Sequence, residues 1–247
     1  MYLINGILHT MASDVIRDGF VSFEHGKITA VGRMDELQLP EQAEVLDVTG
    51  CHIYPGLVDA HSHLGMFGDS LGFESDDGNE ITDPVTPQLR AIDAINPFDR
   101  CFQEAREGGV TTVVTGPGSA NAIGGQMAAI KTVGRRVDDM ILRAPVAMKF
   151  ALGENPKSCY NDRHETPITR MATAALIREE LFKAREYLEK KDRAAADEDA
   201  DAPEFDLKLE ALIPVIRGEL PAHFHAHRAD DIATAVRIAK EFGLKYV

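Results

Sequence analysis

From Tyr54 onward, short apolar segments alternate with helical patterns, and this alternation constrains the fold more than any other feature of the sequence. Apolar and β-branched runs predict strands at residues 57–61, 110–115, 127–133, 146–152 and 220–227. Amphipathic periodicity predicts helices over residues 97–107, 168–191 and 206–217, and from Asp230 or Asp231 as N-cap to Glu241 before Gly243. A repeated strand-then-helix order indicates a parallel sheet of the α/β class.

Residues 1–54 follow a different pattern. Short alternating segments there are separated by turn signals such as His25-Gly26, which predicts a small β meander. We therefore expect two domains, residues 1–54 and 55–247. The acidic, alanine-rich run 192–204 is interpreted as a solvated loop or a frayed helix end, and residues 244–247 as the start of another strand.

Charge and composition exclude several classes of partner. The formal net charge of −14 disfavours nucleic acid and anionic membrane surfaces, which bind clustered Lys and Arg. No apolar run is long enough to cross a bilayer, and the first ten residues lack the pattern of a secretory signal, so we expect a cytoplasmic protein. The three cysteines have no CxxC spacing and are expected to be reduced.

The sharpest local motif is an apolar strand that ends in His-x-His, with the sequence PGLVDAHSH at residues 55–63. Because side chains alternate along a strand, His61 and His63 project to the same side. Two imidazoles placed in this way can bind Zn²⁺ or a similar divalent ion, and Asp59 could orient one of them. The alternative is a pair of exposed histidines in a loop.

A second histidine cluster occupies residues 223–228, with the sequence HFHAHR. His223, His225 and His227 fall at every second position and so share one face of the predicted strand. Metal binding by at least one of them is one hypothesis. The other is that two of the three bind an anionic substrate together with Arg228.

Between the two clusters, Lys149 lies inside an apolar strand and Glu154 follows at the strand's end. A lysine is costly to bury unless it is paired or chemically altered, although its head could also reach water at the mouth of the strand. A substrate anion could be its partner. Glu154 could place a carboxylate at the same rim and bind substrate, or it could be an ordinary loop residue.

The segment PGLVDAHSHLG after a small β domain resembles the first barrel strand of the amidohydrolase superfamily, and the resemblance covers nearly the whole chain. It implies a (β/α)8 TIM-type barrel preceded by a β-sandwich that both chain ends build. The segment HAHRADDI, which begins at His225, resembles the fifth-strand ligand region of the imidazolonepropionase-like and metal-dependent prolidase-like branches. The resemblance thus implies His61, His63 and His225 as metal ligands, with His223 and His227 in reserve.

The Met-Lys-Phe segment around Lys149 is similar to the fourth strand of branches in which a carboxylated lysine bridges two metals. It implies one or two divalent ions, zinc above all, with Lys149 as a ligand. Imidazolonepropionase itself uses one metal and no such lysine, so Lys149 points away from that activity. The family's sixth-strand histidine and eighth-strand aspartate, usually the general base, have no counterpart. We therefore expect the first five to six strands of an incomplete barrel, inactive alone and completed by a missing C-terminal segment or a second chain.

These expectations converge on a metal-dependent hydrolase that cleaves amide or cyclic amide C–N bonds of small molecules, including dipeptides, through a metal-activated water. Residues 65–96 and 116–121 are expected to form the walls of its site, and a homo-oligomer is expected. Cys159 is interpreted as an ordinary loop thiol rather than a nucleophile. The alternative function is a non-catalytic metal-binding or assembly protein that keeps the amidohydrolase fold.

Overall fold

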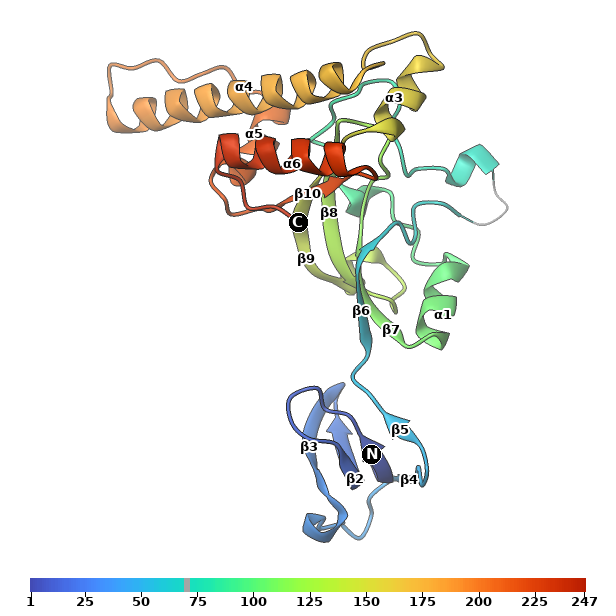
Figure 1. Ribbon diagram of the computed structural model, residues 1–247. Helices are drawn as coiled ribbons and strands as arrows, with labels where there is room; N and C mark the ends of the chain where they lie inside the picture. Colours follow the sequence, from blue (N-terminus) through green and yellow to red (C-terminus); the bar gives the residue numbers. More distant parts are fainter. Residues whose placement is uncertain (69–71) are drawn as a thin grey trace. The chain divides into compact units, whose positions relative to one another are not determined.

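The computed structural model describes residues 1–68 and 72–247 and divides the chain into two compact units, Met1–Leu57 and Val58–Val247. Figure 1 follows the chain through both units. The sequence placed the domain boundary three residues earlier, after residue 54. Each unit is described by itself below.

The first unit is a five-stranded sheet in the order β3-β2-β1-β4, with β5 also paired to β1. Its strands are β1 (Tyr2–Leu8), β2 (Ile16–Glu24), β3 (Lys27–Arg33), β4 (Val45–Asp47) and β5 (His52–Ile53). The β2–β3 hairpin turns at His25 and Gly26, whose φ angles of 50° and 74° give the positive values that tight hairpins need. The predicted meander is therefore present in β1 to β3, whereas β4 and β5 pair with β1 in parallel.

The second unit contains a five-stranded sheet in the order β10-β9-β8-β7-β6. Its strands are β6 (Leu57–Ser62), β7 (Val110–Thr115), β8 (Ile123–Lys131), β9 (Ile141–Ala151) and β10 (Ala222–His225). The last residues of the chain lie beside β10, because the backbone N–H of Ala222 donates to the carbonyl of Lys245 and that of Val247 donates to the carbonyl of Ala222. The predicted strand at the end of the chain is thus present as a parallel bridge.

The expectation of a wholly parallel sheet was wrong. β7 and β8 pair antiparallel, as do β8 and β9, and only the β9–β10 pair is parallel among those three ladders. The reason lies in the connections. Residues 116–122 and 132–140 are too short for the crossover of a dozen or more residues that parallel neighbours need. The second connection holds only the single turn α2 (Val137–Met140).

Three of the helices begin directly after a residue whose side chain caps them. The longer helices are α1 (Arg100–Glu107), α3 (Glu154–Asn161), α4 (Arg170–Ala196), α5 (Leu207–Ile216) and α6 (Ala229–Phe242). The side chains of Asp99, Thr169 and Asp206 accept hydrogen bonds from the first backbone N–H groups of α1, α4 and α5. Gly243 ends α6 in the left-handed conformation that favours glycine at this place.

Several boundaries differ from the predictions: β8 begins at residue 123 rather than 127, β9 at 141 rather than 146 and α1 at 100 rather than 97, and α3 was not predicted. The N-cap of α6 is Arg228, and Asp230 and Asp231 lie in its first turn because each is held by an arginine, Arg228 and Arg170 respectively. Helix α4 continues through Ala196, so the acidic run 192–204 is helical in its first part. Strand β10 ends at His225, which leaves His227 beyond the strand.

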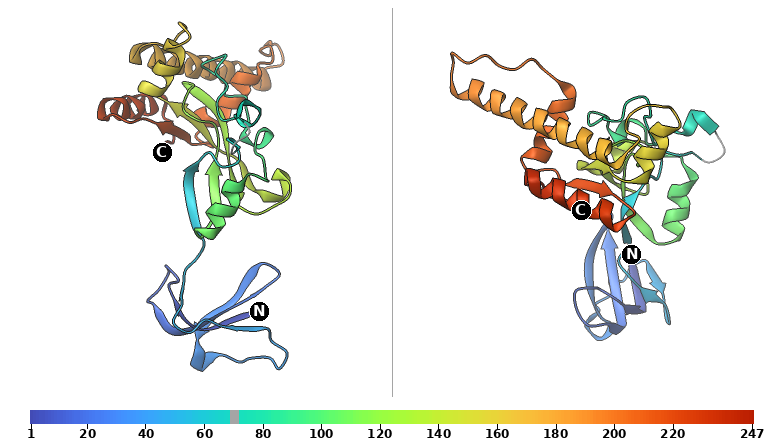
Figure 2. Two further views of the ribbon diagram at one scale, coloured as in Figure 1. Left: turned by 90° about the vertical axis from the view of Figure 1, so that its right-hand side faces the viewer. Right: turned by 45° about the horizontal axis from the view of Figure 1, so that its top comes forward.

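The largest apolar core of the second unit lies between the sheet and the long helices. Phe150 and Met148 of β9, Ile177 and Leu181 of α4, and Ile238 of α6 are all fully buried in it. Figures 1 and 2 show α4, α5 and α6 gathered near β9 and β10, with α1 at a separate place beside β7. A second core cluster forms around Phe102 of α1. Among the described residues, no helix combines the length and apolarity needed to cross a bilayer.

Candidate active site

Three residues of the candidate site, His61, Lys149 and His223, lie close together at the ends of β6, β9 and β10. Nε2 of His61 lies 3.0 Å from Nζ of Lys149, and Nδ1 of His61 lies 2.9 Å from Nε2 of His223. Lys149 and His223 face each other across the parallel β9–β10 ladder. Strands β6 and β10 are at opposite ends of the sheet order, so the contact between His61 and His223 requires the sheet to curl.

Within the described residues, the ring of His63 forms a hydrogen bond through Nδ1. Its Nδ1 lies 2.7 Å from the carbonyl oxygen of Gly116, which can only accept, so Nδ1 carries the proton and Nε2 keeps its lone pair. The rings of His61 and His63 are 5.4 Å apart. The expected role of Asp59 differs, because its Oδ1 accepts from the backbone N–H of His61 rather than from an imidazole.

His225 and its neighbours form the other side of the site. Nε2 of His225 is buried and has no hydrogen-bond partner within the described part of the chain. The ring of His227 lies 4.5 Å from that of His225, and its Nδ1 lies 3.0 Å from Oε1 of Glu154. Arg228, in contrast, forms a bidentate ion pair with Asp230.

Burial lowers the pKa values of the lysine and of four histidines in this cluster. The Lys149 side chain is fully buried, and desolvation lowers its pKa to about 8. Burial, followed by the positive charge of Lys149, lowers the pKa of His61 and of His225 to about 4. The pKa values of His63 and His223 are also lowered by burial. The four imidazoles are therefore neutral at pH 7, which is the form that ligates metal.

The imidazole nitrogens of this site are of the type that binds a divalent ion, but they are not arranged around one point in the described part of the chain. Within residues 1–68 and 72–247, no three His, Cys, Asp or Glu side chains already surround one point at ligand distances. Both ring nitrogens of His61 are instead engaged by Lys149 and His223. However, an unpartnered buried nitrogen on His225 costs free energy unless something binds it, and neutral imidazoles are common ligands of zinc.

A cavity of about 540 Å³ adjoins Lys149 through Gly124, and none of the residues predicted to bind metal or substrate lines it. Residues 76–82 and 88–94 form much of its lining, together with Pro117 and Gly124. Gly124 packs against the stem of Lys149, since a methyl group added there would lie 3.4 Å from Cγ of that lysine. Both segments predicted to form site walls therefore contribute to the cavity, although residues 69–71 of the first segment lie outside the described residues.

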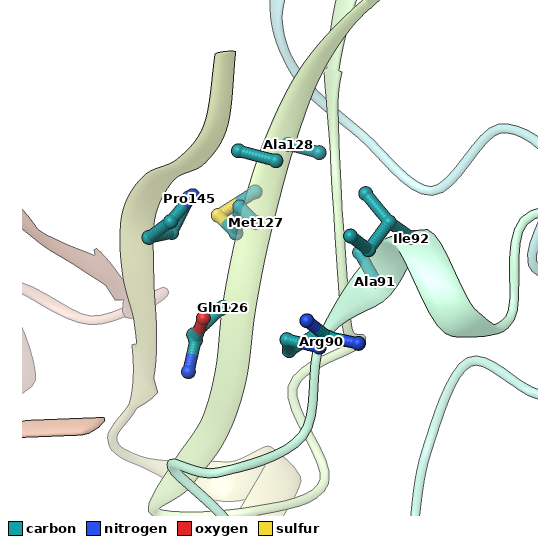
Figure 3. A pocket seen from close by; sticks show the side chains of 8 residues that line it. Arg90, Ala91, Ile92, Gln126, Met127, Ala128 and Pro145 are labelled. Atoms are coloured by element: carbon teal, nitrogen blue, oxygen red, sulfur yellow. The ribbon is translucent and has the colours of Figure 1, made fainter. Parts of the chain in front are cut away.

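A smaller cavity of about 110 Å³ lies farther along β8. Figure 3 shows Gln126, Met127 and Ala128 of β8 between Pro145 on one side and residues 90–92 on the other. None of the residues predicted to bind metal or substrate lines it.

Sequence reasoning missed two groups near the site. One is the carbonyl of Gly116, because a backbone oxygen leaves no trace in residue type. The other is a buried polar network of Thr86, Asn121 and Tyr160. Asn121 was included only as the end of a predicted wall, and a single tyrosine in a short helix gives no periodic signal that could have identified it.

Comparisons with known proteins identify similar sequences and a similar structure. A solved structure titled amidohydrolase from Thermotoga maritima superimposes on 99% of the chain with a TM-score of 0.92 and 43% sequence identity. The amidohydrolase tasK of Hapsidospora irregularis is 34% identical over 244 residues, or 91% of this chain, and an imidazolonepropionase of Bacillus cereus is 46% identical over 56 residues, or 23% of this chain. No family model matches the chain.

The sheet, the His-x-His strand end and these relatives together define the class of protein by its superfamily. The chain belongs to the amidohydrolase superfamily. It spans 63% of the length of the Thermotoga chain, 25% of tasK and 13% of the imidazolonepropionase.

Proposed function

We propose that this protein is a metal-dependent hydrolase that cleaves amide or cyclic amide C–N bonds of small molecules. The observation that carries the proposal is the convergence of His61, Lys149 and His223 beside the unpartnered ring nitrogen of His225. Neutral imidazoles from separate strands, with a cavity of about 540 Å³ that adjoins Lys149 through Gly124, supply parts that metal-assisted hydrolysis needs.

In this proposal His61, His63 and His225 hold one divalent ion, with zinc as the first choice. Lys149, once carboxylated on Nζ, would hold a second ion. Its lowered pKa of about 8 supports that modification, because carboxylation requires the neutral amine. When bound, the ion supplies Lewis-acid chemistry that lowers the pKa of a water and polarises a carbonyl.

The remaining residues of the rim have proposed roles of their own. His227, through Nδ1, and Glu154, through Oε1, form a hydrogen-bonded pair that can orient a substrate amide and hold a proton. His223 holds the His61 ring in place through its 2.9 Å contact. Arg228 is proposed to bind a substrate anion, and it would have to exchange Asp230 for that anion.

The same proposal extends to the fold. We infer that the sheet of the second unit is part of a barrel, because a side-chain contact joins β6 and β10 from opposite ends of the sheet order. The match to 63% of the Thermotoga chain is consistent with a barrel to which further residues contribute. The proposed activity belongs to the completed barrel.

The test combines metal analysis with hydrolysis. Protein purified without chelator should contain zinc or a similar ion by elemental analysis, and the His61→Ala/His63→Ala double variant should lose it. The longest form of the protein should then be incubated with a panel of N-acetyl amino acids, dipeptides and cyclic amides, and the amine released by hydrolysis measured. We expect an activity that the double variant lacks. Lys149→Met should lower metal content, and bicarbonate should speed reconstitution of the wild-type apoprotein only.

A matched control is available in the first unit, where His9 Nε2 and His52 Nδ1 also lie 2.8 Å apart. The His9→Ala/His52→Ala double variant should keep its metal and its activity. Full metal occupancy in the His61→Ala/His63→Ala protein would refute the assignment of ligands. Metal binding without hydrolysis of any amide would favour the non-catalytic alternative.

A further inference from the structure

A buried polar network connects three separate parts of the second unit. The Tyr160 hydroxyl on α3 donates to Oδ1 of Asn121 at 2.7 Å. Nδ2 of Asn121 donates to the carbonyl of Glu80 at 2.7 Å and to Oγ1 of Thr86 at 2.9 Å. Thr86 and Asn121 are each 3% exposed and Tyr160 is fully buried. Burial raises the pKa of the Tyr160 hydroxyl, so this group remains a hydrogen-bond donor.

Both polar atoms of the Asn121 side-chain amide form hydrogen bonds, so removing any partner would leave a buried polar group unpaired. A fully satisfied buried network holds a single conformation, whereas the loss of one member leaves its partners desolvated and unpaired. Hydrophobic contacts alone would fix the position of these loops less specifically. The network is therefore a feature that one substitution can test.

The network acts on a particular segment, residues 78–90. This segment runs beside β8 and the loop before it, with Thr86 N donating to Ile123 O at 2.8 Å and Gln126 N to Leu89 O at 2.8 Å. The bridge between Arg90 and Gln126 continues that pairing, and Figure 3 shows both residues at the smaller cavity. The backbone N–H of Gly118 also donates to the carbonyl of Gly78.

Residues 78–82 and 88–90 of the same segment line the large cavity together with Pro117 and Gly124. Pro117 directly follows Gly116, which holds His63, and Gly124 packs against Lys149. The segment held by Asn121 thus lines a cavity whose other lining residues, Pro117 and Gly124, adjoin groups that hold or contact the candidate ligands. None of the three network residues contacts those ligands through a hydrogen bond that the described structure contains.

We propose that Thr86, Asn121 and Tyr160 are positioning residues that fix segment 78–90 as the substrate-binding wall of this site. The inference rests on the proposed hydrolase function for its substrate, but the fixing of the wall can be measured independently. The network then determines how well a substrate amide binds and leaves metal binding unchanged.

Thr86 offers a matched pair of variants. Thr86→Val has nearly the same shape but lacks the hydroxyl that accepts from Asn121 and donates to the carbonyls of Ile123 and Gly124, whereas Thr86→Ser keeps it. In the metal-loaded protein, hydrogen exchange followed by mass spectrometry should be about tenfold faster in residues 78–90 of Thr86→Val, since loss of a buried hydrogen-bond partner typically has this effect on local opening. Peptides from β9 and the metal content should be unchanged, and Thr86→Ser should resemble wild type.

The kinetic readout uses the panel amide that the wild-type protein hydrolyses fastest. KM should rise about tenfold in Thr86→Val while kcat changes little, because the wall contributes to binding rather than to the reacting bond. If Thr86→Val does not fold, Tyr160→Phe removes a different hydrogen bond of the same network and should give the same local pattern.

Exchange in residues 78–90 that stays at the wild-type rate in both variants would overturn the proposal. So would a uniform increase throughout the second unit, which would indicate a general loss of stability. An unchanged KM, or a fall in kcat with loss of metal, would also overturn it. If no panel amide is hydrolysed by the wild type, the proposed function fails, and the exchange comparison still decides whether the network fixes the wall.

Discussion

At Lys149, a charged amine is held where no carboxylate of the described structure pairs with it. The side chain is fully buried, and its nearest polar neighbour is an imidazole nitrogen of His61. Desolvation disfavours the ammonium form, which is why its pKa falls to about 8. Beyond the effect of burial, the same positive charge lowers the pKa values of His61, His63, His223 and His225 further. The site is thus built to keep its nitrogen donors unprotonated.

This arrangement predicts a particular pH dependence for the stability of the metal-free protein. The four histidines have folded-state pKa values below the ordinary 6.5, with His61 and His225 near 4. Between about pH 6.5 and 4 the unfolded chain therefore binds more protons, and the free energy of unfolding falls as pH is lowered. Each kcal/mol lost should lower Tm by roughly 2–4 °C in a chain of this size.

Thermal unfolding in the presence of a chelator, measured from about pH 7.5 to about pH 4.5, tests this expectation. The His61→Asn/His225→Asn double variant should show a shallower decline, because two of the groups that gain protons on unfolding are absent. A decline of equal steepness in the variant would show that other groups control acid unfolding.

Among the elements, β9, α3, α4 and α6 meet at Asp231. This residue is 3% exposed and forms a bidentate ion pair with Arg170, the first residue of α4. Gly153, between β9 and α3, packs directly against the Asp231 carboxylate and has a φ of 84°. Because Lys149 and Glu154 flank this glycine in sequence, the junction determines how the rim of the candidate site is held.

We expect Gly153→Ala to destabilise the protein more than a positive φ alone explains. Gly109 is a matched control, since its φ is 83° but nothing lies within 4 Å of an added methyl. Gly109→Ala should cost about 1–2 kcal/mol for the left-handed backbone. Gly153→Ala should cost more, because the methyl group would collide with Oδ2 of Asp231 and because the ψ of −136° at Gly153 lies outside the left-handed region that other residues can adopt. Urea unfolding of the two variants measures the difference, and equal midpoints would contradict it.

For the whole molecule, the two units differ in how much apolar surface they bury. In the first unit, Leu8 and Phe20 are the apolar side chains in the buried core, whereas the second unit has two extensive core clusters. A small core contributes little free energy against the entropy of ordering the chain. The stability of the 247-residue chain should therefore be uneven.

Hydrogen exchange of this chain should show residues 1–57 exchanging at least about tenfold faster than β8 and β9, because exchange through local opening reports regional stability. Calorimetry should correspondingly resolve a low-temperature transition that disappears when only the first unit is destabilised by Phe20→Ala. A single cooperative transition affected equally by Phe20→Ala and by Ile177→Ala would contradict this view.

Much of the architecture follows from local sequence signals. Capping residues such as Asp99, Asp206 and Gly243 set helix ends because they satisfy backbone groups within a few residues. Strand β7 has the bounds that its β-branched run predicts. The direction of β8 was not predicted, because pairing direction depends on the length and course of the connections rather than on the apolar pattern.

The same division applies to the candidate site. Residue type and spacing on their own determined that His61 and His63 share a side, that three histidines recur at every second position from His223, and that Lys149 lies in an apolar strand. Only the tertiary structure decided that His61 meets Lys149 and His223, that Gly116 orients His63, and that Asn121 connects a distant segment to α3. These contacts join residues far apart in the chain, and their geometry depends on the curl of the sheet, which no local pattern specifies.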